Sequence, residues 1–368
     1  MRRLFAVLTL LCLLLASAAD AERRIKLASF VPEGSVWDKN LRQMGEEWKR
    51  GTDGRVSLKV FAGGQQGEEP TVLSKMRLDV LQAAALTILG LAHLDEGFNV
   101  FAIPFFYESY EELHHVMAAL TPELEARLEA KGFVMLNWGD AGWLQVFSKR
   151  PVTTLDALRE IPIYTSAGFD EMVQWYRANG FEPRPLAFSD VPTALSTGLI
   201  EAVPITPVAA LFLQWYRTAP HMIEIGLSPL VGATVLTKKS WKALSEEDRA
   251  TLRAAAARTQ ERLREAVPRQ DREAIAEMEK RGLTVAKPSD PEAWRELGNR
   301  FAALMRGSYV PEALFDRAVA ERDAFRHRVA EHAFSRRDGV VERDAFRHRV
   351  AEHAFSRRDG VAERDAFR

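Results

Sequence analysis

Short apolar segments alternate with helical segments through most of the chain, and this alternation is the strongest constraint on its fold. Apolar runs at residues 24–30, 56–61 and 83–89 precede segments with helical spacing. A further run at residues 158–168 ends in Ser-Ala-Gly and starts a second cycle of the same kind. Strands that alternate with helices pair in mostly parallel sheets. The sequence therefore predicts an α/β protein with two lobes and a cleft between them.

The order of these segments predicts how the lobes are divided. Lobe I is assigned to residues 22–148 with 230–245, because a strand-like run near 230 can return the chain to the first sheet. Lobe II is assigned to residues 149–229. Residues 246–318 are rich in Ala, Arg and Glu and predict helices that brace both lobes.

Two prolines lie inside predicted helices. Proline lacks the N–H that a helix interior needs, and its ring clashes with the preceding turn. Pro122 is therefore expected to divide the segment at residues 110–131 into a helix pair. Pro268 is expected to kink or break the long helix at residues 246–281.

The first 21 residues have the parts of a secretory signal peptide. Arg2 and Arg3 precede an apolar run at residues 4–15, and small residues follow. The run is too short to span a bilayer comfortably, so cleavage near Ala18 or Ala21 is expected rather than a membrane anchor. The signal looks bacterial and predicts a soluble protein of the periplasm.

Charge, cysteine content and motifs exclude several functional classes. The net charge is −1, which predicts no electrostatic attraction to nucleic acid. Cys12, the only cysteine, lies inside the signal segment, so the mature chain would have no thiol nucleophile or thiol ligand. No serine-hydrolase, zinc-protease or P-loop motif occurs, and we expect no cofactor and no metal site. The adjacent His114 and His115 are expected on a helix surface.

An exported enzyme on the same scaffold is an alternative. It requires a base and a nucleophile that converge at the cleft. Asp140, Asp170 and Glu201 are the available carboxylates, but their context is that of helix caps or solvated residues. We therefore expect a binding protein and not an enzyme.

Aromatic residues gather at or just beyond the predicted strand ends and helix starts. These residues are Phe30, Trp37, Trp138, Trp143, Tyr164, Phe169 and Phe212. Strand ends of both lobes face the cleft in a two-lobed α/β protein. Any one of them could instead fill the core, but core packing alone explains the whole set poorly. The Gly-Gly-Gln-Gln-Gly turn at residues 63–67 is expected at the rim of the cleft, with Gln65 as a candidate ligand residue.

A unit of 21 residues recurs at the C-terminus. Residues 321–328, Glu-Arg-Asp-Ala-Phe-Arg-His-Arg, recur from position 342, and their first six residues recur from position 363. Near-identity over so short a unit indicates a recent duplication. Residues 319–368 are expected to form a frayed or partly helical tail. The alternative is a helical arm that binds a partner.

Several motifs, in order and spacing, resemble one family. They are residues 25–28, 63–67, 103–106 (Ile-Pro-Phe-Phe), 155–159, 194–202 and 240–248. The span from residue 24 to 318 resembles the solute-binding proteins of tripartite ATP-independent periplasmic (TRAP) transporters, the DctP type. The resemblance implies a type II periplasmic-binding-protein fold with a long bracing helix. It also implies closure around a small-molecule ligand and delivery to the small and large membrane subunits.

The chain departs from the family pattern at two places. The family usually has an arginine that pairs with a substrate carboxylate where this chain has Tyr164. Residues 201–205, Glu-Ala-Val-Pro-Ile, replace a more polar family pattern and include Ile205. Both changes resemble a branch with a hydrophobic cleft that works with a TPR-repeat periplasmic protein. An apolar or amphipathic ligand is therefore expected, oriented by hydrogen bonds from Tyr164, Thr165 and Thr206. A small organic acid is the alternative.

Overall fold

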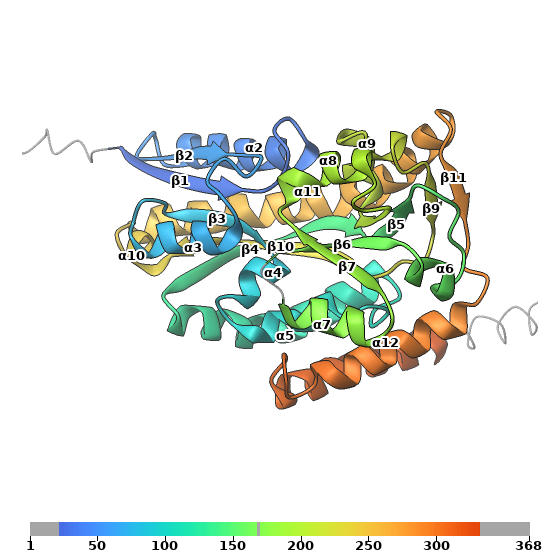
Figure 1. Ribbon diagram of the computed structural model, residues 1–368. Coiled ribbons are helices and arrows are strands. Elements are labelled where there is room, and N and C mark those ends of the chain that lie inside the picture. Colours follow the sequence, from blue (N-terminus) through green and yellow to red (C-terminus); the bar gives the residue numbers. More distant parts are fainter. Residues whose placement is uncertain (1–21, 168–169, 332–368) are drawn as a thin grey trace, which may run out of the picture.

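Two mixed β-sheets, each covered by helices, form the centre of the protein (Figure 1). The computed structural model describes residues 22–167 and 170–331. The predicted signal peptide, Phe169 and most of the repeat tail lie outside the described residues. The predicted two-lobed α/β architecture is confirmed.

The sheet of lobe I has five strands in the order β2-β1-β3-β10-β4. They are β1 (Arg23–Ser29), β2 (Val56–Phe61), β3 (Ala83–Thr87), β4 (Phe133–Trp143) and β10 (Pro229–Thr237). β1 pairs in parallel with β2 and β3, whereas β10 runs antiparallel between β3 and β4. β10 follows lobe II in the chain and returns to complete this sheet.

The sheet of lobe II has six strands in the order β11-β9-β5-β8-β6-β7. They are β5 (Gln145–Ser148), β6 (Pro162–Ser166), β7 (Glu182–Leu186), β8 (Ala202–Ile205), β9 (His221–Ile223) and β11 (Thr284–Ala286). β6 pairs in parallel with β7 and β8, so the carboxyl ends of these strands lie at one edge of the sheet. β7 contains Pro183 and Pro185 and is an edge strand, where a missing N–H costs little.

Helices cover both sheets. Lobe I carries α2 (Val36–Gly51), α3 (Glu69–Arg77), α4 (Ile88–Ala92), the 3₁₀ segment η1 (Glu96–Ala102), α5 (Tyr110–Ala130) and α10 (Lys238–Lys242). Lobe II carries α6 (Leu155–Arg159), α7 (Asp170–Ala178), η2 (Phe188–Asp190), α8 (Val191–Thr197), α9 (Pro207–Phe212) and η3 (Trp215–Arg217). The side chains of Ser35, Ser109 and Thr154 cap α2, α5 and α6, because each accepts a backbone N–H of the first turn. Within the described part of the chain, no helix has both the length and the apolar character to cross a membrane.

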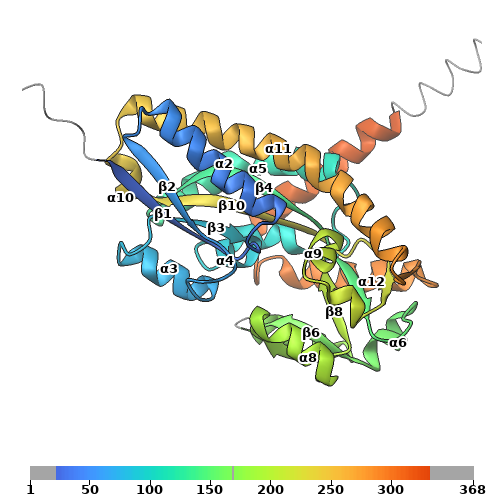
Figure 2. The same ribbon diagram turned by 90° about the horizontal axis from the view of Figure 1, so that it is seen from above.

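The longest helix, α11 (Glu246–Glu279), packs against both lobes (Figure 2). Leu252 near its start lies in a core cluster of lobe I. Leu263 and Val267 in its middle pack against Trp37 of α2. Met278 near its end lies in the core of lobe II. One helix thus contributes to the cores of both lobes and to the contact between them.

The predicted division of residues 110–131 at Pro122 is wrong, and of the two outcomes expected at Pro268, a kink or a break, the break does not occur. α5 continues through Pro122, and α11 continues through Pro268. An interior proline costs a helix about 3 kcal/mol. In α5 the fully buried Leu113, Val116 and Leu120 are among the side chains that offset this cost, since each contributes roughly 1.5–3 kcal/mol. Tertiary packing therefore outweighs the local penalty.

The C-terminal part ends in two further helices. α12 (Pro291–Met305) lies near α7 in Figure 1, and Trp175 of α7 packs edge-on against Phe301 at a ring distance of 4.7 Å. Residues 312–331 form the last described helix, which carries the buried Leu314 and Phe315. Residues 321–328 of its second half contact α5 and the segment before it, whereas residues 327–331 are exposed.

Gly232 in β10 provides a test of how closely β10 packs against β3. A Cβ at this position would lie 2.2 Å from the Leu86 carbonyl oxygen of β3, which belongs to a rigid neighbouring strand. We expect Gly232→Ala to lower the free energy of unfolding by about 1–3 kcal/mol, as overpacking in a core does. Urea unfolding followed by circular dichroism measures this change.

Gly139 is the matched control, because it is paired with Gly232 across the β10–β4 ladder. A Cβ at Gly139 would meet its nearest atom, Leu263 Cδ1, at an ordinary 3.7 Å. Gly139→Ala should therefore change stability by less than about 1 kcal/mol. Equal effects of the two substitutions would contradict the close approach at Gly232.

Candidate functional site

The chain passes from one sheet to the other between β4 and β5, and parts of three other segments meet it there. Gly142, near the end of β4, has a φ of 109°. A Cβ at Gly142 would lie 2.7 Å from Asp271 Oδ2 and 2.9 Å from Thr206 Cβ. Glycine is therefore required both by the backbone conformation and by the close approach of α11 and the end of β8.

Asp271 of α11 accepts hydrogen bonds from two other segments. Its Oδ2 accepts the N–H of Trp143, and its Oδ1 accepts the N–H of Val208 in the first turn of α9, both at 3.2 Å. Burial raises the pKa of Asp271 to about 6. The two backbone N–H groups and the nearby Tyr110 hydroxyl act in the opposite direction but do not cancel this effect.

α5 contributes two aromatic rings to the same region. The ring of Tyr110 packs edge-on against Trp143 at 5.3 Å and lies 6.0 Å from the ring of His114. Burial, together with the charges of Asp271 and Asp140, raises the pKa of the Tyr110 hydroxyl. We call Tyr110, His114, Asp140, Trp143 and Asp271 the interlobe cluster.

The expectation that Asp140 is a helix cap or a solvated residue is wrong, and His114, which lies on a helix as expected, is largely covered. His114 Nε2 lies 2.8 Å from Asp140 Oδ2, and the two side chains are 14% and 5% exposed. The Asp140 backbone oxygen also accepts the indole N–H of Trp37 at 3.0 Å. Asp140 is therefore a buried residue of β4 with a partner in α5, and not a helix cap.

Three buried hydrogen-bonding groups in this region have no hydrogen-bond partner among the described residues. They are the hydroxyls of Thr165 and Thr206 and the indole N–H of Trp143. Thr165 lies near the carboxyl end of β6, and Thr206 follows β8, so both are at the edge where parallel strands of lobe II end. A buried polar group without a partner costs about 1–3 kcal/mol, so such groups mark positions where a ligand can bind.

Tyr164 lies on β6 beside these groups. Its side chain packs in the core cluster of lobe II, and its hydroxyl lies 3.2 Å from Ser166 Oγ. Burial raises the pKa of Tyr164, and the charge of Glu68 from lobe I acts in the same direction. Tyr164 is therefore close enough to lobe I to feel one of its carboxylates.

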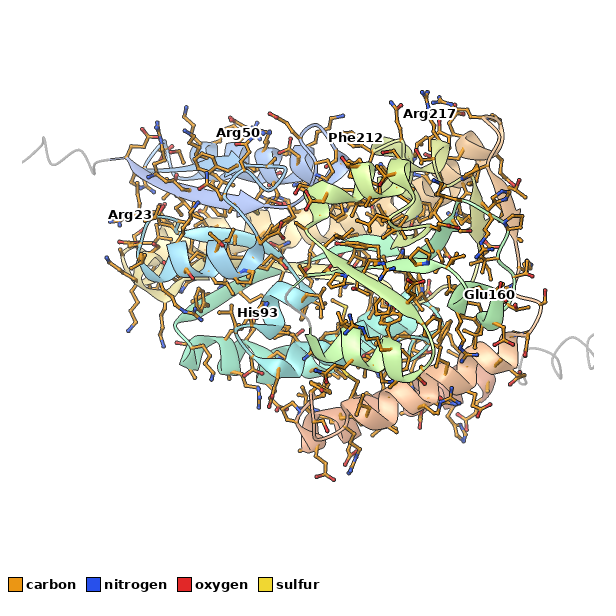
Figure 3. The ribbon with its side chains drawn as sticks, viewed as in Figure 1. Arg23, Arg50, His93, Glu160, Phe212 and Arg217 are labelled. Atoms are coloured by element: carbon orange, nitrogen blue, oxygen red, sulfur yellow. The ribbon has the colours of Figure 1, made fainter. Side chains whose placement is uncertain are left out.

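The other predicted ligand residues are placed differently. Ile205 is buried in the core cluster of lobe II. Phe30 packs against the 63–67 turn, where a Cβ on Gly64 would lie 3.6 Å from its ring, and Gln65 is exposed on that turn. Phe212 is 44% exposed at the end of α9, as Figure 3 shows at the upper edge of the molecule. Phe169 lies outside the described residues.

Trp37 and Trp138 have core contacts that use their indole N–H groups. The N–H of Trp138 donates to Thr121 Oγ1 at 2.9 Å, and its ring packs edge-on against Phe101 at 5.3 Å. Trp37 donates to the Asp140 carbonyl oxygen, as described above, and is 7% exposed. Neither indole N–H is free to orient a ligand.

The carboxylates of the enzyme alternative are not brought together. Glu201 forms an ion pair with Arg150 at 3.4 Å, whereas Asp140 pairs with His114. The side chain of Asp170 lies outside the described part. No group of three or more His, Cys, Asp or Glu residues that could hold a metal ion occurs among the residues that the structure describes.

A surface hollow of about 360 Å³ is lined by Tyr216, Arg217, Pro220, Arg281 and Gly282. It lies at the far side of lobe II, where Arg217 points away from the molecule in Figure 3. None of the predicted ligand residues lines it. The candidate site is therefore defined by the unpartnered groups at the crossing and not by this hollow.

Sequence reasoning missed Tyr110, His114 and Asp271. A signal for Asp271 was present, because it lies four residues after Val267 and seven before Met278, on the buried side of α11. An acidic residue on such an apolar stripe indicates a buried, partnered carboxylate. The partners of Tyr110 and His114 lie on distant segments, so no local pattern revealed them.

The raised pKa of Asp271 predicts a pH dependence of stability. Its folded pKa is about 6 against an ordinary 3.8, so the folded protein retains a proton that the unfolded chain loses. The contribution of Asp271 to the free energy of unfolding should therefore fall by about 3 kcal/mol as the pH rises from about 4 to about 6, and then stay constant. Urea unfolding of the wild type and of Asp271→Asn across this pH range measures the difference.

The free energy of unfolding of the wild type minus that of Asp271→Asn should fall as the pH rises. A value that is independent of pH, or that grows with pH, would contradict a buried carboxylate of raised pKa. Glu277→Gln on the same helix serves as the control. Glu277 forms exposed ion pairs with Arg281 and Lys280, and its pKa is lowered by them. The contribution of Glu277 to the free energy of unfolding should therefore rise with pH, in the opposite direction to that of Asp271.

Comparison with known proteins places the chain in a family. Residues 27–305 match the model named DctP, described as bacterial extracellular solute-binding protein, family 7. The C4-dicarboxylate-binding periplasmic protein DctP of Rhodobacter capsulatus is 25% identical over 279 residues, which cover 74% of this chain and 83% of that protein. The 2,3-diketo-L-gulonate-binding periplasmic protein YiaO of Escherichia coli K12 is 27% identical over 255 residues, 68% of this chain and 76% of that protein.

A solved structure has the same fold. It is a TRAP periplasmic solute binding protein from Xanthobacter autotrophicus Py2 with bound β-D-galacturonate, and it superposes with a TM-score of 0.75 at 20% identity. The match covers 81% of this chain and 99% of that one. The fold is thus the two-lobed type II fold. Since the family model spans most of the chain, this protein belongs to the DctP family of bacterial extracellular solute-binding proteins.

Proposed function

We propose that this protein is the periplasmic receptor of a TRAP transporter. It captures a small solute between its lobes, closes around it and delivers it to the membrane subunits. The family match supports the receptor role, and relatives whose names call them periplasmic support the compartment. The signal-like segment at residues 1–21 agrees with export.

The observation that carries the binding site is the set of unpartnered groups at the crossing. Trp143 is the last residue of β4 in lobe I, whereas Thr165 and Thr206 come from lobe II. A ligand between the lobes gives these groups acceptors and removes the cost of leaving them unpaired. Binding is then linked to closure, because only the closed arrangement brings both sets of groups to one ligand.

The ligand that fits these groups best has oxygen atoms and an apolar face. Hydroxyls and an indole N–H donate to oxygen acceptors, while the rings of Tyr110, Trp143 and Tyr164 offer apolar surface. Tyr164 occupies the position where the family usually has an arginine, so a bidentate cation is missing from β6. An amphipathic solute that carries no required negative charge is therefore one candidate.

A small organic acid is the second candidate. The relatives described above are named for C4-dicarboxylates and 2,3-diketo-L-gulonate, and the Xanthobacter protein holds galacturonate. In this chain Arg184 on β7 is the register neighbour of Tyr164. Its guanidinium pairs with Glu182, and its buried Nε has no partner, so Arg184 is the cation that could meet a carboxylate.

The membrane subunits are the expected partners of the closed form. A TPR-repeat periplasmic protein is a further expected partner, because the departures from the family pattern resemble the branch that works with one. Neighbouring genes for two membrane subunits and a TPR protein would support this assignment. Their absence beside this gene would count against it.

Removal of the Thr206 hydroxyl tests the binding site. Thr206→Val keeps the shape of the side chain but removes a buried group that has no partner in the free protein. The free protein should therefore be as stable as the wild type or slightly more stable, whereas ligand affinity should fall about tenfold. Native mass spectrometry of the purified protein identifies the ligand, and isothermal titration calorimetry measures its affinity.

Thr259→Val is the matched control. Thr259 is equally buried, but its hydroxyl already donates to the Ala255 carbonyl oxygen at 3.0 Å. This substitution should leave ligand affinity unchanged. If Thr206→Val binds the ligand as well as the wild type does, the hydroxyl at the end of β8 does not contact it.

Arg184→Gln separates the two ligand classes. For a neutral amphipathic solute, affinity should stay within about twofold of the wild type, because no ion pair to the ligand is lost. For galacturonate or succinate held by Arg184, affinity should fall at least about tenfold. Arg295→Gln, which removes an exposed arginine paired with Glu292 on α12, controls for the general loss of charge. A large loss confined to Arg184→Gln would establish the organic acid.

A further inference from the structure

The last described helix carries the first copy of the 21-residue repeat, and this copy is docked on lobe I (Figure 2). Residues 321–328 lie against a surface formed by Phe106, Glu108, Glu112 and His115, at and before the first turns of α5. We call this surface the repeat groove. The docked copy is half-buried at Glu321, Arg322, Phe325 and Arg326.

Arg326 makes the central contact. Its Nε and Nη2 donate to the two carboxylate oxygens of Glu112 at 3.0 and 2.9 Å, and Nη2 also donates to the Phe106 carbonyl oxygen at 3.2 Å. The Glu112 side chain is only 3% exposed. Without a guanidinium, this buried carboxylate would lose its charged partner, which is costly. The groove therefore favours occupation by an arginine of this kind.

Further side chains of the first copy add to this contact, and one of them is Arg328, whose Nη2 lies 3.1 Å from His115 Nε2. The Arg322 guanidinium lies 4.3 Å from the centre of the Phe106 ring. The Phe325 ring lies 5.5 Å from the His115 ring, and Glu321 Oε2 lies 3.1 Å from His115 Nε2. The repeat groove thus contacts one acidic side chain, three arginines and one aromatic ring, which lie on the same face of the helix.

The same side chains recur in the second copy. Residues 342–349 have the sequence of residues 321–328 without a change, so Glu342, Arg343, Phe346 and Arg347 match the docked set. Identical segments have the same intrinsic affinity for the same surface. We propose that the repeat groove is a binding site for residues 342–349, which replace residues 321–328 in the same molecule when the first copy leaves.

Covalent linkage explains why the first copy is the one seen in the groove. It directly follows Leu314, Phe315 and Ala318, which are buried against lobe I. The corresponding positions before the second copy are Ser335, Arg336 and Gly339, which cannot make these apolar contacts. The second copy must therefore loop out 21 residues, and the entropy cost of such a loop grows only slowly with its length.

Replacement of the first copy by the second copy of the same molecule is favoured over replacement by a copy from another molecule. A short tether holds the second copy near its own groove at an effective concentration of about millimolar. A groove on another molecule offers no such advantage at micromolar protein. The second copy then acts as an alternative occupant of the repeat groove. This inference does not depend on which solute the receptor binds.

Substitutions at matched positions of the full-length protein test the proposal. Arg326→Ala removes the central contact of the first copy. The combined Arg347→Ala and Arg368→Ala, here called the distal pair, removes the equivalent arginines of the second and third copies, and the triple variant carries all three substitutions. The distal pair alone should leave the Tm within about 1 °C of the wild type. Arg326→Ala should lower the Tm by about 2 °C, and the triple variant by a further 2–4 °C or so. Equal Tm values for Arg326→Ala and the triple variant would overturn the proposal.

Glu112→Ala is the control, because it removes the carboxylate that every copy would use. In this background the distal pair should have no effect, and a further loss would show that the tail acts elsewhere. Light scattering should find Arg326→Ala monomeric over a hundredfold concentration range, whereas a concentration-dependent dimer would overturn exchange within one molecule. Phe325→Ala, with Phe346→Ala and Phe367→Ala as its distal pair, repeats the comparison if Arg326→Ala does not accumulate.

Discussion

The carboxylate of Asp271 connects three segments that are far apart in the chain. It sits on α11 and accepts one N–H from the strand that crosses between the lobes and one from the first turn of α9. Both oxygens are used, so neither backbone donor remains unpaired in a buried region. The absence of a side chain at Gly142 is what lets α11 come this close. Asp271 and Gly142 thus contribute, beside the apolar contacts of α11, to how the two lobes are joined.

This arrangement also decides which groups are left for a ligand. Asp271 and the Asp140 carbonyl already accept the donors that the fold itself provides, including the indole N–H of Trp37. The Thr206 hydroxyl lies beside Gly142 without a partner. Unpaired donors at the boundary of two lobes cost free energy in the free protein, and under the proposed function a bound solute would offset that cost.

The sequence predicted the architecture well because the strands follow a simple pattern of apolar runs, caps and glycines. It failed where long-range packing overrides a local rule, as at Pro122 and Pro268, whose helices continue because their apolar faces are buried. The candidate site was predicted in part. Thr165 and Thr206 were predictable from their position at strand ends, whereas the contact of His114 with Asp140 joins residues of different elements and has no local signature.

The continuity of α11 has a mechanical consequence. A helix of 34 residues anchored in both cores resists bending, so opening of the lobes must be concentrated where the helix is least stiff. Pro268 has no N–H to donate to the Arg264 carbonyl oxygen, so this turn has one helical hydrogen bond fewer, and it directly follows Val267, which packs against Trp37. The proline that fails to end the helix thus leaves one turn with fewer helical hydrogen bonds, at the place where α11 passes from the core of lobe I toward that of lobe II.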